Sequence, residues 1–156
     1  MCETVNINAE VLRLRQSRLM QEDGQYLVFD EAIARILSAR NVEHIPLLCQ
    51  GFDDATEHYE VMFGLIHAVE GYHKIASPEV ATGYFIKSIS VMVPHASEWA
   101  KQMLRRFLNK ADDRQILRKS LAAAETNDWT MAVKLLQKIA SEDAERFNQA
   151  VVEVLD

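Results

Sequence analysis

Residues 142–155 read EDAERFNQAVVEVL. The apolar members of this segment recur at i, i+3, i+4, i+7 and i+8, as Phe147, Ala150, Val151, Val154 and Leu155. Such a stripe covers one face of an amphipathic helix and leaves the opposite face polar. The segment therefore predicts a helix that must bury its apolar face against another element.

The same spacing recurs along the rest of the chain. Ser77 and Pro78, for example, form a helix-capping pair directly before a further apolar stripe. The predicted helices are 8–21, 29–40, 45–50, 54–72, 79–92, 95–109, 112–125, 128–140 and 142–155. Because the connections are short, consecutive helices should pack as antiparallel hairpins. The predicted fold class is all-α, with antiparallel helical hairpins stacked in a compact, HEAT-like right-handed array of about 8–9 helices.

The composition agrees with a single helical domain. The 156 residues include only 5 Gly and 3 Pro, too few for the turns of an all-β sandwich. We therefore expect residues 1–156 to form one all-helical domain. No apolar run is long enough to span a bilayer, and the N-terminus lacks the features of a signal peptide. We expect a cytoplasmic protein with no membrane partner, and with free thiols at Cys2 and Cys49.

Acidic side chains are concentrated in one part of the chain. The sequence has 17 Lys and Arg against 23 Asp and Glu, a net charge of −6, which argues against a nucleic-acid partner. Residues 41–79 contain a single basic residue, Lys74, and the acids Glu43, Asp53, Asp54, Glu57, Glu60, Glu70 and Glu79. This cluster predicts either attraction of a cationic partner or a solvated surface whose acids favour the start of a helix.

The segment 54–72 is apolar around most of its circumference, apart from one strip. The strip comprises Glu60, Gly64, His67 and Gly71, at i, i+4, i+7 and i+11. Three interpretations stay open. The strip is a polar cluster in the core, in which Arg105 or Arg106 pairs with Glu60 or Glu70; or a functional groove; or a metal or catalytic site.

Signatures of catalysis and metal binding are missing from the sequence. Glu70 and His73 form one Glu-x-x-His motif, whereas a di-iron bundle uses a pair of them. The five histidines form no HExxH, and neither a GxSxG nor a glycine-rich phosphate loop occurs. We therefore expect no enzyme, with no catalytic residue, metal ligand or cofactor.

Two stretches resemble a known family. Residues 58–70 read HYEVMFGLIHAVE and residues 98–109 read EWAKQMLRRFLN. Together they resemble the Immunity protein 30 family of bacterial polymorphic-toxin systems, over about residues 28–125. One departure is conservative, since the family tends to have Arg-Ile-Leu-Asn where this chain has Arg106, Phe107, Leu108 and Asn109.

The resemblance implies an all-helical, cytoplasmic immunity protein. Such a protein binds and neutralises the toxic C-terminal domain of a cognate toxin, as in contact-dependent growth inhibition, and a cationic nuclease is one candidate toxin. On this basis the predicted partner-binding residues are Asp53, Asp54, Glu57, Glu60 and Glu70. The alternative is a generic helical-repeat adaptor for another protein, and a homodimer stays open.

Other residues of the two stretches are expected to serve the fold: Tyr59, Gly64, His67, Trp99 and Asn109. A tight interface also needs an aromatic anchor near the acids. The candidates for that anchor are Tyr59, Tyr72 and Phe52.

Overall fold

The computed structural model describes residues 4–156, and over these residues the chain forms α-helices and short 3₁₀ turns with no strand. The helices are α1 (Ile7–Ser17), α2 (Gln25–Ser38), α3 (Ile45–Leu48), α4 (Tyr59–Glu70), α5 (Pro78–Met92), α6 (Ser97–Leu108), α7 (Ala111–Ala122), α8 (Thr126–Glu142) and α9 (Ala144–Leu155). The predicted all-α class and the number of helices are confirmed. Within the same residues, no helix has both the length and the apolar character that crossing a membrane requires.

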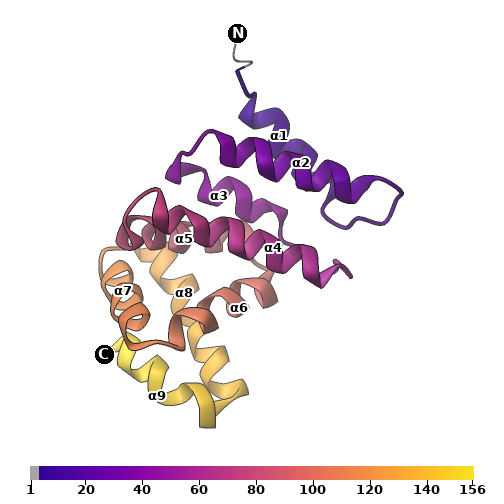
Figure 1. The fold of residues 1–156 in the computed structure, drawn as a ribbon. Coiled ribbons are helices and arrows are strands. Elements are labelled where there is room, and N and C mark those ends of the chain that lie inside the picture. The colour runs from indigo at the N-terminus through magenta and orange to yellow at the C-terminus, as the bar shows by residue number, and fades with distance from the viewer. Residues whose placement is uncertain (1–3) are drawn as a thin grey trace.

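The helices follow one another in chain order from one end of the molecule to the other. Figure 1 shows α1 and α2 at one end and α9 at the opposite end. Alternate helices are in contact, because α5 packs against α3 and α7, α6 against α8, and α7 against α9. Among the consecutive helices predicted to pack together, α6 is in contact with α7 and α8 with α9. The right-handed, HEAT-like course of the array stays a prediction.

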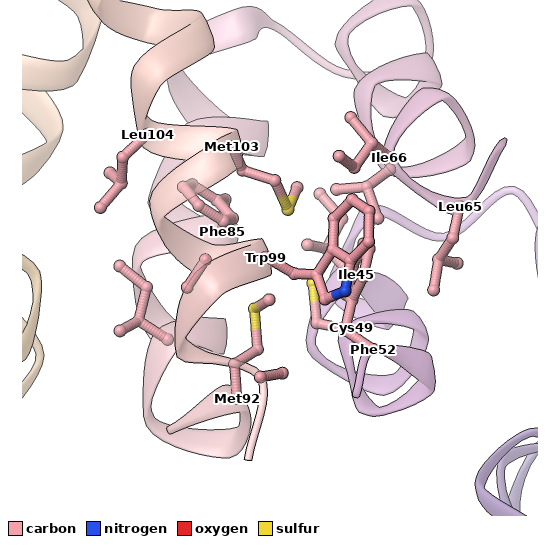
Figure 2. Packing of buried hydrophobic residues seen from close by; sticks show 14 of the residues in the cluster. Ile45, Cys49, Phe52, Leu65, Ile66, Phe85, Met92, Trp99, Met103 and Leu104 are labelled. Carbon is pink, nitrogen blue, oxygen red and sulfur yellow. The ribbon is translucent and has the colours of Figure 1, made fainter. Parts of the chain in front are cut away.

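One cluster of buried side chains extends along the array, from Val11 in α1 to Val154 in α9. Figure 2 shows part of it, with the Trp99 ring pointing from α6 toward Phe52. Cys49 is buried in this cluster as a free thiol, and burial raises its pKa to about 12 despite the hydrogen bond with Ser88. The other cysteine predicted to be a free thiol, Cys2, lies outside the described residues.

Side chains directly before the helices cap the starts of both α5 and α9. The Ser77 hydroxyl accepts a hydrogen bond from the Val80 N–H at 3.2 Å, and Pro78 is the first helical residue. At α9 the carboxylate of Asp143 caps the helix, by accepting from the Arg146 N–H at 3.3 Å. The preceding helix α8 therefore continues to Glu142, further than the apolar stripe alone predicts.

The helix predicted over 54–72 begins only at Tyr59. The Asp53 carboxylate instead accepts from the Ala55 N–H at 2.8 Å, and the Asp54 N–H donates to the carbonyl of His95 at 2.8 Å. The buried Thr56 hydroxyl donates to the carbonyl of Arg18 at 2.8 Å. Short polar side chains that bond to backbone in this way compete with helix formation. Residues 52–58 are therefore a loop, which we call the brace loop, fastened to α1 and to the start of α6.

The polar strip of α4 faces solvent. Glu60, Gly64 and His67 are exposed, and the helix buries the opposite face, with Met62, Leu65, Ile66 and Val69. A Cβ atom built on Gly64 meets no other atom within 4 Å, so no neighbouring backbone within this chain requires a glycine there. The interpretation of the strip as a buried polar cluster is wrong for these residues.

Candidate functional site

A pocket lies between the first halves of α4 and α6, next to the brace loop. Its volume is about 340 Å³. Figure 1 shows α4 and α6 as neighbours on the same side of the array. We call this hollow the aromatic pocket, and its lining residues are Asp54, Tyr59, Phe63, Glu98, Trp99, Gln102 and Arg105.

Aromatic rings form the pocket wall around Trp99. The ring centroid of Trp99 lies 6.2 Å from that of Phe52, 6.0 Å from that of Tyr59 and 5.3 Å from that of Phe63, which meets it edge-on. Trp99 and Phe52 are buried, but Tyr59 is 61% exposed and Phe63 is 37% exposed. Aromatic clusters of this kind normally bury their rings. The pocket therefore presents two accessible aromatic rings packed on a buried base of Trp99 and Phe52.

Asp54 supplies the polar end of the pocket and also caps α6. Its Oδ2 accepts from the Glu98 N–H at 3.1 Å and its Oδ1 from the Trp99 N–H at 3.4 Å. Burial raises the pKa of the Asp54 carboxyl above its ordinary value, although these two hydrogen bonds oppose that shift. The adjacent Asp53 pairs at 3.1 Å with Arg18, the residue that follows α1. Both aspartates therefore hold the brace loop in place.

A charged network lies behind the pocket and joins α6 to α8. The ammonium of Lys101 is buried, 2.7 Å from Glu142 Oε1 and 2.9 Å from Glu98 Oε1. Burial by itself lowers the pKa of Lys101, but the hydrogen bonds with Glu142 and Glu98 outweigh it and the pKa is raised. Arg105 lies 3.4 Å from the second Glu142 oxygen. The cations next to the pocket are thus already paired.

The far ends of α4 and α6 are joined by Glu70 and Arg106. Two hydrogen bonds, of 2.9 and 2.8 Å, connect the guanidinium to the carboxylate. Since Tyr59 contacts Trp99 near the starts of these helices, α4 and α6 run in the same direction. The stretches 58–70 and 98–109, singled out from the sequence, therefore lie side by side as these two helices.

The five predicted partner-binding residues have two different environments. Asp53, Asp54 and Glu70 make the intramolecular bonds described above. Glu57 and Glu60 are exposed, and neither carboxylate has a hydrogen bond or ion pair with any residue in the range 4–156. Glu57 and Glu60 do not line the aromatic pocket, but they lie close in the chain to Tyr59, which does. Glu70 lies at the far end of α4.

Of the predicted aromatic anchors, only Tyr59 is accessible, because Phe52 and Tyr72 are fully buried. Phe63 and Glu98 line the pocket but are not among the site residues predicted from the sequence. Phe63 was detectable, since it stands one helical turn after Tyr59 and shares its face. Glu98 had no such signal, because the pairing of α4 with α6 is a tertiary contact.

Of the residues expected to serve the fold, Trp99 does so by its burial and ring contacts. Tyr59, Gly64, His67 and Asn109 are exposed instead, and so are available to a partner. As to metals, residues 4–156 contain no group of three or more His, Cys, Asp or Glu side chains placed to hold an ion.

Comparison with known protein families matches residues 16–117 to the family described as Immunity protein 30. The match covers more than half of the chain and includes all of α2 to α6, and hence the brace loop and the aromatic pocket. No curated protein and no solved structure matches the chain.

Proposed function

The chain belongs to the Immunity protein 30 family, and on that premise we propose that it is a cytoplasmic, non-enzymatic inhibitor of a bacterial toxin. The partner is the C-terminal domain of a cognate toxin from a contact-dependent growth inhibition system or a related polymorphic-toxin system. We take residues 1–156 as one immunity domain, an assignment supported by the continuous cluster of buried side chains from α1 to α9.

The observation that carries this proposal is the accessible aromatic pair, Tyr59 and Phe63, next to the unpaired acids Glu57 and Glu60. Aromatic residues dominate the binding energy of interfaces, and acids at the rim speed the approach of a cationic partner. Tight neutralisation needs about 1,200–2,000 Å² of total buried surface. We therefore expect the interface to extend from the aromatic pocket along the exposed strip of α4.

A cationic toxin domain, such as a nuclease, fits this surface best. Enzymes that act on nucleic acid carry positive patches at the site where the phosphates bind. A negative surface that covers such a patch competes directly with the substrate. The proposed mechanism is therefore electrostatic attraction followed by steric blockade.

The direct test is co-expression with the C-terminal toxin domain encoded by the gene immediately upstream. We expect the chain to restore growth and to form a complex with the purified domain in calorimetry and size-exclusion chromatography. An unrelated toxin domain serves as the control. Failure to restore growth, together with no detectable complex, would overturn the proposal.

The alternate-helix packing is also the architecture expected of a generic helical-repeat adaptor. Such an adaptor would bind a protein without protecting cells from any toxin. Co-expression separates the two functions, because an adaptor leaves the toxicity of the upstream domain unchanged.

A further inference from the structure

We propose that the aromatic pocket is the receptor for one arginine side chain of the toxin domain. This inference rests on the proposed function and deepens it, since it names the chemical group that the site takes. Three properties of the pocket favour an arginine: accessible ring faces, carboxylates with free acceptor capacity, and cations that are already paired.

The accessible rings favour a planar cation. Tyr59 and Phe63 together expose aromatic surface around a pocket of about 340 Å³, and both rings are supported from behind by Trp99. A guanidinium stacks on such rings and gains cation–π attraction. A guanidinium is also less strongly hydrated than an ammonium, so arginine loses less hydration free energy than lysine when it enters the pocket.

The carboxylates of the pocket have acceptor capacity to spare. Each Asp54 oxygen accepts one backbone N–H, and a carboxylate oxygen has two lone pairs. Glu98 shares one oxygen with Lys101, yet its side chain remains 65% exposed. A guanidinium donates in a fork that matches two such acceptors. The carboxylates of Asp54 and Glu98 have no proton to donate to a carboxylate of the partner. An apolar side chain in the pocket would desolvate them and leave them unpaired.

The one cation in the lining does not compete for the site. Arg105 bonds to Gln102 at 3.4 Å and lies 3.4 Å from the carboxylate of Glu142, so its charge is matched on the α8 side. Lys101 and Arg105 are together balanced by Glu98 and Glu142, which leaves the Asp54 carboxylate as the unbalanced charge of the lining. Glu57 and Glu60 add further negative charge nearby without partners of their own. The local charge of the site thus complements an arginine.

The first experiment uses small probes with the intact chain, followed by NMR. N-acetyl-arginine amide should shift the Trp99 indole signal and the backbone amides of Tyr59 and Phe63 in a saturable manner. N-acetyl-leucine amide should not, and N-acetyl-lysine amide should bind more weakly. The Glu98→Gln variant should weaken arginine binding about tenfold. Equal responses to arginine and leucine would overturn the assignment of a cationic occupant.

The second experiment uses the toxin domain and separates this inference from the proposed function. Tyr59→Ala and Phe63→Ala should each weaken the complex about 30-fold or more, as anchors do, with unchanged circular dichroism. The matched control is Trp129→Ala, which removes another exposed aromatic ring, on α8. If the unaltered chain binds toxin but neither pocket variant changes the affinity, the pocket assignment fails alone. If the unaltered chain binds no toxin, the proposed function fails as well.

Discussion

Glu70 and Arg106 form a two-pronged ion pair that joins the last residue of α4 to α6, with hydrogen bonds of 2.9 and 2.8 Å. Paired bonds of this geometry fix the relative orientation of the groups they join. The pair therefore helps to fix how the aromatic rings at the other end of the same two helices lie relative to one another. Glu70 is a predicted partner-binding residue, but its carboxylate is paired with Arg106 of the same chain.

The strength of this pair can be measured by a double-mutant cycle of Glu70→Gln, Arg106→Met and the double variant. Both side chains are more than a third exposed, so solvent screens the pair. We expect a coupling free energy of about 0.5–1 kcal/mol in urea unfolding. A cycle in which the two effects simply add would contradict a stabilising role for the pair.

Removing the Asp54 cap should destabilise the fold. Asp54→Ala leaves the first N–H groups of α6 without a side-chain acceptor, and we expect a loss of about 1 kcal/mol in the free energy of unfolding. Asp54→Asn keeps one acceptor oxygen and should cost less, which makes it the matched control. Equal stability of Asp54→Ala and the unaltered chain would show that the cap is dispensable.

The same residue gives a test of pH dependence. Because burial raises the pKa of Asp54 above 3.8, ionisation is less favourable in the folded chain than in the unfolded chain. The stability of the unaltered chain relative to Asp54→Asn should be greatest below about pH 3.8 and should fall as the pH rises through the raised pKa. Urea titrations from about pH 3 to pH 6 measure this difference, and an increase with pH would contradict it.

Glu142 should show the opposite dependence on pH. The hydrogen bond with Lys101 lowers the pKa of Glu142 below 4.5. The stability of the unaltered chain relative to Glu142→Gln should be fully present above about pH 4.5 and should be lost as the pH falls through the lowered pKa. The control is Glu145→Gln, an exposed acid that has no partner among the described residues. A constant difference across the acid range would show that the Lys101 network contributes nothing.

Alanine at Gly64 should separate stability from binding. A Cβ atom at Gly64 or at Gly83 meets no other atom within 4 Å, so Gly64→Ala and Gly83→Ala should each raise the free energy of unfolding by about 0.5–1 kcal/mol. Only Gly64 lies on the strip proposed to face the toxin. Gly64→Ala should therefore weaken toxin binding, by about tenfold, while Gly83→Ala leaves it unchanged. Unchanged affinity in both would remove the strip from the interface.

Charge reversal at the unpaired acids tests electrostatic attraction. Glu57→Lys and Glu60→Lys should each slow association with the toxin domain severalfold at low salt and flatten its dependence on salt. Glu145→Lys on α9 changes the total charge equally and is the control. These acids suit the test better than Asp53 or Asp54, whose reversal would loosen the brace loop. Identical association rates for Glu60→Lys and Glu145→Lys would exclude local attraction.

Much of the fold follows from local information. The stripe from Phe147 to Leu155 predicts α9, and the Ser77–Pro78 pair predicts the start of α5, because apolar spacing and capping act within one or two turns. The predicted pairing of an arginine with Glu70 is also confirmed, with Arg106 as the partner. The resemblance of stretches 58–70 and 98–109 to the Immunity protein 30 family is confirmed by the family match over residues 16–117.

By itself, then, the sequence determined the helical class, most helix positions and the family, since each depends on neighbours along the chain. The tertiary structure alone decided which arginine pairs with Glu70, what Asp53 and Asp54 do, and which face of α4 is open. Asp54 caps α6, more than forty residues later in the chain, by accepting from the N–H groups of Glu98 and Trp99, so the predicted helix over 54–72 starts late. Tyr59 and Phe63 become accessible beside Glu57 and Glu60 because α4 has enough apolar side chains to bury one face and still display rings on the other.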